Sequence, residues 1–291
     1  MKMKHINIPG SQSATLDAYL LDCETTYGQA VARPAVVVCP GGGYLYCSPR
    51  EGEPVALRYA ASGFHAFVLR YSVGRDAASF APLKEISWAI GHIRDNASAW
   101  NINPEKIAVC GFSAGGHLAL SAGLLAENKP NAMILGYPAT CCPNFPGADF
   151  MLKLLEGKQT VTDVDAAKYD LPSQVTSMAP PMFVASTAED PLTAFCTLPL
   201  VQAYTAKGLK CELHMFQYGP HGYSLADETT ADGSHEMIEP AFAQWHKLSV
   251  LWLQKTFGKP EFVEKSTSKM MGYLKELGFV PKDTPDGPIV R

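Results

Sequence analysis

The sequence lacks a long apolar run, a basic block and the pattern of a secretion leader. No stretch approaches the roughly 18 uninterrupted apolar residues of a membrane-spanning helix, and the opening MKMKHINIPG holds no apolar signal core. Twenty-four Lys and Arg oppose 28 Asp and Glu, which leaves a formal net charge of -4. Because no run of cations could neutralise a row of phosphates, nucleic acid is not an expected partner. We expect a cytoplasmic protein without a membrane partner.

Metal-binding signatures are also missing. The eight cysteines form no C-x-x-C pair, and the chain contains no H-E-x-x-H, so we expect no metal site. Cysteines scattered over a long chain without a secretion signal favour reduced thiols over disulfides. They are Cys23, Cys39, Cys47, Cys110, Cys141, Cys142, Cys196 and Cys211.

Charged residues are sparse, at 18% against 47% hydrophobic residues. A chain of 291 residues with this composition can bury a large core, which excludes disorder as its main state. A single α/β domain commonly reaches this length. We predict one domain over 1–291.

Short apolar runs rich in β-branched residues alternate with longer segments of helical periodicity. The predicted strands are 34–39, 65–71, 106–110, 131–137, 181–186 and 211–216. The predicted helices are 52–62, 83–100, 114–126 and 195–207. Runs that are apolar throughout indicate strands buried on both faces, and the alternation requires crossover connections. The pattern predicts an α/β fold with a mainly parallel sheet and helices on both faces.

The alternation of predicted strands and helices defines a core over about 34–256. Two segments depart from this alternation. Residues 139–179 are rich in Pro, Asp, Gly and Thr, and we expect a small cap-like insertion over the edge where the strands end. The tail, 257–291, is predicted to be a helix docked on its own domain, with a contact in a homo-oligomer as the alternative. Its weak apolar stripe consists of Met270, Leu274 and Leu277.

The segment Gly111-Phe112-Ser113-Ala114-Gly115 follows the predicted strand KIAVC and opens the next predicted helix. A strand, a tight turn and a helix form the setting of a nucleophile elbow. The turn is so tight that side chains two residues to either side of the serine would collide, and Gly111 and Gly115 remove them. An ordinary Gly-rich turn is the alternative. The pattern indicates that Ser113 is a nucleophile.

A serine hydroxyl is a weak nucleophile, so it needs an imidazole to accept its proton and a carboxylate to orient that imidazole. Asp190 and His221 each follow a predicted strand, and their order after Ser113 is the one that accompanies this elbow. We predict that Asp190 is the acid and His221 the base. Glu189 remains open as the acid because spacing does not rank adjacent residues, and His235 is the second candidate for the base.

Three consecutive glycines follow the first predicted strand, in Cys39-Pro40-Gly41-Gly42-Gly43-Tyr44. Glycines leave backbone N–H groups unhindered, and the N–H of the residue after the nucleophile is the usual second donor to an oxyanion. We predict an oxyanion hole made by Gly42 or Gly43 together with Ala114. Neither G-x-G-x-x-G nor G-x-x-x-x-G-K-[ST] can be written through these glycines, so a nucleotide site is not indicated.

Aromatic residues near these loops are candidates for lining a substrate pocket, with ordinary packing as the alternative for each. They are Tyr44, Tyr46, Phe112, Phe195 and Tyr223. A narrow pocket of this kind would accept acetate and propionate esters and exclude decanoate esters.

The stretches VVVCPGGGYLYC, INPEKIAVCGFSAGGHLALSAG, ASTAEDPLT and CELHMFQYGPHGYSLA resemble small bacterial esterases of the α/β-hydrolase superfamily related to acetylxylan and feruloyl esterases. The resemblance covers about residues 34–256. It implies an α/β-hydrolase fold and a serine esterase without cofactors. It assigns the catalytic roles to Ser113, Asp190 and His221, and the oxyanion loop to Gly41, Gly42 and Gly43. The implied substrates are short-chain esters of small molecules, namely acetylated sugars or oligosaccharides.

Other functions stay open at this point. A lipase or a thioesterase would use the same residues and differ only in the leaving group or the acyl length. A peptidase of this fold usually carries a large extra domain, for which the chain has no room. From a different class, the chain could be a non-catalytic binding module on a hydrolase scaffold, which the complete set of three catalytic residue types disfavours.

Overall fold

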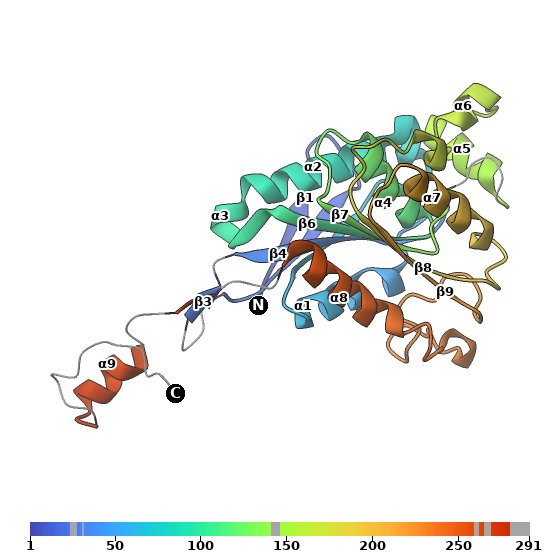
Figure 1. The fold of residues 1–291 in the computed structure, drawn as a ribbon. Helices are drawn as coiled ribbons and strands as arrows, with labels where there is room; N and C mark the ends of the chain where they lie inside the picture. Colours follow the sequence, from blue (N-terminus) through green and yellow to red (C-terminus); the bar gives the residue numbers. More distant parts are fainter. Residues whose placement is uncertain (24–27, 31, 141–145, 259–261, 265–268, 280–291) are drawn as a thin grey trace.

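An eight-stranded sheet runs through the protein (Figure 1). The computed structural model describes residues 1–23, 28–30, 32–140, 146–258, 262–264 and 269–279. The strands are β1 Lys2–Asn7, β2 Thr15–Leu20, β4 Arg33–Cys39, β5 His65–Arg70, β6 Ile102–Phe112, β7 Ala132–Gly136, β8 Met182–Thr187 and β9 Cys211–Phe216. Their spatial order is β1-β2-β5-β4-β6-β7-β8-β9.

The sheet is mainly parallel, as the sequence predicts. All pairings from β5 through β4, β6, β7 and β8 to β9 are parallel, because each connection crosses over the sheet through a helix or a long loop. The pairings of β1 with β2 and of β2 with β5 are antiparallel. Neither β1 nor β2 was predicted from the sequence. The edge strand β1, KMKHIN, is almost entirely exposed, and β2, TLDAYL, is interrupted by Asp17 and so is not apolar throughout.

Nine helices are seen in the described residues. They are α1 Glu53–Ala61, α2 Ala81–Asp95, α3 Ala97–Trp100, α4 Ala114–Leu125, α5 Ala148–Glu156, α6 Asp163–Ala167, α7 Ala194–Ala206, α8 Gln244–Phe257 and α9 Lys269–Glu276. The predicted helix over 83–100 is two helices, because the backbone leaves helical geometry at Asn96 (φ -97°, ψ 7°). No described helix has both the length and the apolar character needed to cross a membrane.

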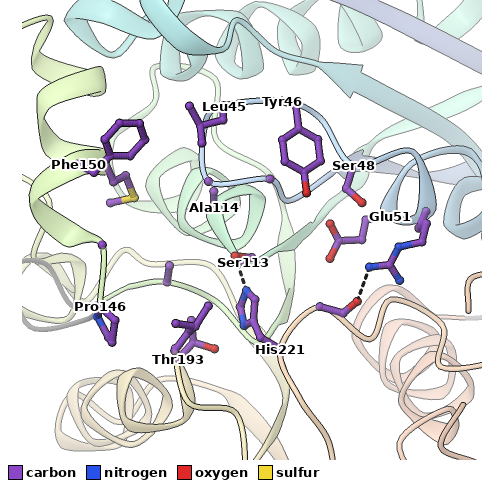
Figure 2. A pocket seen from close by; sticks show the side chains of 18 residues that line it. Leu45, Tyr46, Ser48, Glu51, Ser113, Ala114, Pro146, Phe150, Thr193 and His221 are labelled. Carbon is purple, nitrogen blue, oxygen red and sulfur yellow. Dashed lines mark hydrogen bonds between the residues drawn. The ribbon is translucent and has the colours of Figure 1, made fainter. Parts of the chain in front are cut away.

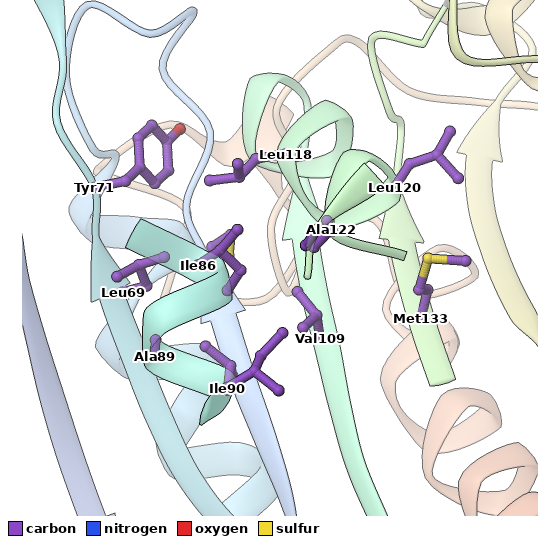
Figure 3. Close-up of a cluster of buried hydrophobic side chains, with 14 of the residues drawn as sticks. Leu69, Tyr71, Ile86, Ala89, Ile90, Val109, Leu118, Leu120, Ala122 and Met133 are labelled. Atoms are coloured by element: carbon purple, nitrogen blue, oxygen red, sulfur yellow. The ribbon is translucent and has the colours of Figure 1, made fainter. Parts of the chain in front are cut away.

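Two apolar layers hold the helices against the sheet. On one face, Ile86 and Ile90 of α2 and Leu118 of α4 are fully buried together with Val109 of β6 (Figure 3). On the other face, α1 and α8 are joined by a hydrogen bond between Tyr59 Oη and Ser249 Oγ at 2.8 Å. Full burial of each such apolar side chain contributes about 1.5–3 kcal/mol, so both layers stabilise the position of the strand ends.

The edge strand β9 corrects one prediction. Residues 211–216 are expected to be buried on both faces, but five of the six positions in β9 are only half-buried and one is exposed. The reason is that β9 lies at the end of the sheet and has a neighbour, β8, on one side only.

The segment 139–179 between β7 and β8 contains α5, α6 and a short 3-10 turn, η3 Leu171–Gln174. The turn before α6 is fixed by a capping box between Thr162 and Asp165, and Lys158 and Lys168 pair with Asp165 at 2.6 and 3.1 Å. Cys141 and Cys142 lie outside the described residues. The thiols of Cys23, Cys39, Cys47, Cys110 and Cys211 are free.

The tail departs from its predicted position. A two-stranded sheet of β3 Gly28–Ala30 and β10 Phe262–Glu264 leads to α9, which lies apart from the main sheet in Figure 1. Tyr273 and Leu277 are 62% and 53% exposed, so the prediction of a helix docked on its own domain is wrong. The helix ends at Glu276, so Leu277 does not extend the apolar stripe of the sequence along a helical face.

Candidate active site

Ser113 occupies a strained turn between β6 and α4. Its backbone has φ 51° and ψ -117°, and such a conformation costs on the order of 1–3 kcal/mol for a residue other than glycine. A Cβ on Gly111 would lie 2.0 Å from the carbonyl oxygen of Gly115, and a Cβ on Gly115 would lie 2.1 Å from that of Cys39. The turn therefore requires glycine at both positions. The Ser113 N–H donates to the carbonyl of Gly136 at 3.0 Å, which ties the turn to β7.

The hydroxyl of Ser113 meets an imidazole from the loop after β9. His221 Nε2 lies 2.8 Å from Ser113 Oγ (Figure 2). On the other side of the ring, His221 Nδ1 lies 2.8 Å from Asp190 Oδ2. The ring of Tyr137 stands edge-on to the imidazole, with 5.2 Å between ring centroids. The three side chains predicted from the sequence are thus brought into one hydrogen-bonded chain.

Asp190 is buried in the loop between β8 and α7 and is held as a carboxylate. It accepts hydrogen bonds from Thr193 Oγ1 at 2.6 Å and from the N–H groups of Leu192 and Thr193 at 2.8 and 3.1 Å. Burial alone would raise its pKa, but the hydrogen bond and the charge of His221, with the bonds from Thr193 and Leu192, outweigh it and lower the pKa. Asp190 therefore stays ionised beside His221.

Glu189, the alternative to Asp190, and His235, the alternative to His221, lie apart from the hydrogen-bonded chain at Ser113. Glu189 is exposed, and its carboxylate accepts the N–H of Gly219 at 3.3 Å. His235 is exposed on a 3-10 turn, η4 His235–Met237. Neither residue contacts Ser113. Glu189 contacts the loop that carries His221 but not the imidazole itself.

Gly42, Gly43 and Ala114 line a cavity of about 420 Å³ together with Ser113 and His221. Gly42 and Gly43 have positive φ values of 122° and 63°, and the carbonyl of Gly42 accepts the N–H of Leu45 at 2.9 Å, which folds the loop back on itself. Ala114 is the first residue of α4, so its N–H has no partner within the helix and lies at the positive end of the helix dipole. The three residues of the predicted oxyanion hole thus border the same cavity as Ser113 and His221.

The cavity has an apolar side and a polar side (Figure 2). Leu45, Pro146, Phe150 and Met151 form the apolar side. Tyr46, Ser48, Arg50 and Glu51 form the polar side. Pro146, Gly147, Phe150 and Met151 belong to the 139–179 insertion, which therefore supplies one wall.

The prediction that Tyr44, Phe112 and Tyr223 line the substrate pocket is wrong, because all three are buried in the protein's interior. Tyr44 is fully buried, and its hydroxyl pairs with His117 Nδ1 at 2.8 Å. Phe112 packs between Tyr137 and Trp245, and Tyr223 packs on Phe242. Of the other two aromatic candidates, Tyr46 lines the cavity and Phe195 does not.

Glu51 and Tyr137 were not predicted from the sequence. Glu51 is only 3% exposed and lines the cavity, and Tyr137 Oη donates to its Oε1 at 2.5 Å. A glutamate in the polar segment SPREGE has the pattern of a surface residue, so no local signal marks it. Within the described ranges, no three His, Cys, Asp or Glu side chains are gathered as metal ligands.

Comparisons with known proteins match most of the chain. The BD-FAE family model matches residues 21–137. The chain is 31% identical over 220 residues to endo-1,4-beta-xylanase B of Butyrivibrio fibrisolvens, covering 70% of this chain and 34% of that protein. It is 29% identical over 221 residues to the acetylxylan esterase of Xylanibacter ruminicola, covering 73% of this chain and 45% of that protein. The matches span less than half the length of either relative.

Solved structures match over nearly their full length. An alpha/beta hydrolase enzyme from a Medee basin deep-sea metagenome library is 37% identical, with a TM-score of 0.76, covering 89% of this chain and 99% of that chain. A carboxylesterase from Lactobacillus plantarum is 28% identical, with a TM-score of 0.80, covering 88% of this chain and 98% of that chain. This chain therefore shares its overall architecture with these two proteins.

Proposed function

The chain belongs to the α/β-hydrolase family, and from this premise we propose that it is a serine carboxylesterase that hydrolyses short-chain, acetyl-type esters. The observation that carries the proposal is the chain of hydrogen bonds from Ser113 Oγ through His221 to the Asp190 carboxylate, at 2.8 Å each. This is the arrangement that turns a serine hydroxyl into a nucleophile at neutral pH. In the proposed reaction Ser113 is the nucleophile, His221 the general base and acid, and Asp190 the group that orients the imidazole.

Acylation begins when Ser113 Oγ attacks the carbonyl carbon of the ester and His221 Nε2 takes the hydroxyl proton. The carbonyl oxygen becomes an oxyanion, which accepts hydrogen bonds from the N–H of Ala114 and from that of Gly42 or Gly43. The Asp190 carboxylate stabilises the imidazolium through Nδ1. The bond to the leaving oxygen then breaks, His221 gives its proton to that oxygen, and the alcohol departs.

Deacylation repeats these steps with water in place of serine. His221 Nε2 takes a proton from water, the hydroxide oxygen attacks the acyl carbon, and the same amides hold the second oxyanion. The bond to Ser113 Oγ breaks, and His221 returns the proton to it. The products are one carboxylic acid and the free enzyme, and no cofactor takes part.

For the alcohol part of the substrate we propose an acetylated sugar or short oligosaccharide. A cavity of about 420 Å³ falls within the roughly 300–1,000 Å³ of small-molecule sites. Ser48, Arg50 and Glu51 give it a polar side suited to a hydroxylated leaving group, and Leu45 and Phe150 give it an apolar side suited to an acyl group. The likeness to an acetylxylan esterase supports the same substrate class.

Replacement of the nucleophile tests the proposal. Ser113→Ala removes the attacking oxygen, so turnover of a short-chain aryl acetate should fall by about 10⁴- to 10⁶-fold. The far-UV circular dichroism spectrum and the melting temperature should persist, because the methyl group fits where Ser113 Cβ already lies. Turnover within tenfold of the wild type would contradict the proposal. Matched acetyl, propionyl, decanoyl, thioester and amide substrates separate an acetyl esterase from a lipase, a thioesterase or a peptidase.

A further inference from the structure

Glu51 lies in the wall of the active-site cavity, directly beside the loop that carries the predicted oxyanion donors. The residue is 3% exposed. Oε2 accepts the N–H of Gly41 at 2.9 Å, and Oε1 accepts the hydroxyl of Tyr137 at 2.5 Å. Both partners are hydrogen-bond donors, so both contacts need acceptor oxygens.

The contact with Gly41 lies next to the nucleophile. A Cβ built on Gly41 would lie 2.6 Å from Glu51 Oε2, 2.9 Å from the carbonyl oxygen of Phe112 and 3.2 Å from Ser113 Cβ. Gly41, Glu51 and Ser113 therefore pack around one point. The N–H of Gly41 is used by Glu51, whereas no hydrogen bond from the N–H of Gly42 or Gly43 is seen among the described residues, and both glycines line the cavity with Ser113.

The contact with Tyr137 connects Glu51 to the loop that carries His221. Tyr137 Oη accepts the N–H of Ser224 at 2.8 Å, and its ring stands edge-on to His221. Ser224 Oγ in turn donates to the carbonyl of Arg50 at 2.7 Å. One buried carboxylate thus links the glycine loop, the end of β7 and the loop that carries His221.

Glu51 is costly to bury. The neighbouring Arg50 directs its terminal nitrogens to the carbonyl oxygens of Thr230 and Gly222 at 2.9 and 3.0 Å, not to the carboxylate. Burial raises the pKa of Glu51 against the lowering effect of its hydrogen bonds. A hydrophobic side chain would cost less there if the site only needed to be filled.

We propose that Glu51 is a positioning residue for acyl transfer, whose carboxylate holds Gly41 so that the next amides in the loop point at the developing oxyanion. The inference rests on the proposed esterase function. It predicts a loss of transition-state binding rather than of substrate binding, because the oxyanion forms only during the reaction.

Glu51→Gln tests this inference. Glutamine keeps the size of the side chain but offers one acceptor oxygen to the two donors Gly41 N–H and Tyr137 O–H. On an aryl acetate, kcat should fall at least tenfold while KM stays within twofold. Inhibition by an aryl trifluoromethyl ketone, whose adduct with Ser113 carries an oxyanion, should weaken by the same factor as kcat.

Glu85→Gln is the matched control. Glu85 is also a buried carboxylate, and it accepts hydrogen bonds from Ser72 N–H and Ser11 Oγ at 2.8 Å each and from the Ser72 hydroxyl. It lies on α2, outside the cavity. The kcat and the inhibitor affinity of the Glu85→Gln variant should stay within twofold of the wild type. If Glu51→Gln fails to fold, Glu51→Asp is the second variant. It keeps the charge, but its side chain is shorter by one methylene, so the carboxylate oxygens lie farther from Gly41 N–H and Tyr137 O–H, and kcat should fall in the same way.

Three results would overturn the inference. They are a folded Glu51 variant with wild-type kcat and inhibitor affinity, a rise in KM at unchanged kcat, and an equal loss of kcat in Glu85→Gln. The same assay separates this failure from failure of the proposed function. A wild-type protein that hydrolyses no ester contradicts the esterase proposal itself, whereas an active wild type with an unaffected Glu51 variant contradicts only the role of Glu51.

Discussion

At the scale of single residues, Asp190 shows how hydrogen bonds fix a buried carboxylate within the site. Four donors converge on the carboxylate of Asp190, whose side chain is 1% exposed. They are His221 Nδ1, Thr193 Oγ1 and the N–H groups of Leu192 and Thr193. Three of them belong to its own loop, so the carboxylate is fixed before it meets the imidazole. A fixed carboxylate presents His221 Nε2 to Ser113 in a single orientation.

Asp190→Asn should lower kcat by about 10⁴-fold, because an amide in this place favours the wrong imidazole tautomer and leaves the imidazolium without its counter-charge. Steady-state kinetics with an aryl acetate measure the effect. Glu189→Gln, the same change at the adjacent exposed acid, should lower kcat less than tenfold. Equal losses in the two variants would contradict the assignment of Asp190.

The catalytic residues predicted from the sequence share one property: each lies in the segment that follows a strand, in a motif with a steric or chemical reason. Ser113, Asp190 and His221 are of this kind. Glu51 is not, since its burial depends on the fold of the loop between β4 and α1. Tyr44 was predicted to line the pocket but is buried. Its hydroxyl is paired with the ring of His117, a helical residue 73 positions away. Pairings between distant segments leave no local pattern in the sequence.

At the scale of elements, the turn from β6 to α4 depends on close backbone approach. A Cβ on Gly115 would lie 2.1 Å from the carbonyl oxygen of Cys39 and 2.4 Å from that of Pro40. Both atoms belong to backbone at the end of β4, so neither can yield by a side-chain rotation. The predicted oxyanion loop begins at the same residues, so we expect a change at Gly115 to affect both stability and activity.

Gly115→Ala should therefore lower the free energy of unfolding by about 1–3 kcal/mol, the usual cost of overpacking, and should also lower kcat. Urea unfolding followed by tryptophan fluorescence measures the first effect. Gly272→Ala is the control, because Gly272 lies in the exposed helix α9 and a Cβ added there would meet no atom within 4 Å. A Gly115→Ala protein as stable and active as this control would contradict the steric argument.

Most of the parallel strands could be predicted because they are buried and apolar throughout, and most of the helices because apolar residues recur along them at helical spacing. The antiparallel strand β1 could not, because an edge strand with one neighbour needs no apolar run, and β2, TLDAYL, is interrupted by Asp17 and so is not apolar throughout. The period of the tail predicts a helix, which α9 is, but does not decide where that helix docks. Tertiary position depends on a complementary surface, which a single segment does not encode.

At the scale of the whole molecule, three buried histidines make stability depend on pH. Burial lowers the pKa of His117 to about 3 and those of His65 and His246 to about 4. His65 Nδ1 accepts the N–H of Leu21 at 3.1 Å, as a neutral imidazole does. Unfolding returns each histidine to an ordinary pKa of about 6.5, so the unfolded chain binds more protons than the native protein between these values.

Stability contributed by these neutral histidines is complete above about pH 6.5 and is lost as the pH falls toward 4. Each should lower the free energy of unfolding by up to about 1.4 kcal/mol per pH unit in that window. His246→Phe removes one of the three and keeps the ring contact with Tyr59, whose centroid lies 4.6 Å away. Urea unfolding at pH 7, 6 and 5 gives the slope of the free energy of unfolding against pH, and in this variant that slope should correspond to about one proton fewer. An unchanged slope would contradict the neutral state of His246.

The proposed mechanism depends most on one step, the covalent acylation of a Ser113 that His221 has activated. Intact and peptide mass spectrometry after brief treatment with a fluorophosphonate measure this reactivity most directly. One phosphonyl group should add per chain, on the peptide that contains Ser113, and the His221→Ala variant should react slower by several powers of ten. Rapid labelling at another residue, or no difference between the wild type and His221→Ala, would contradict the mechanism.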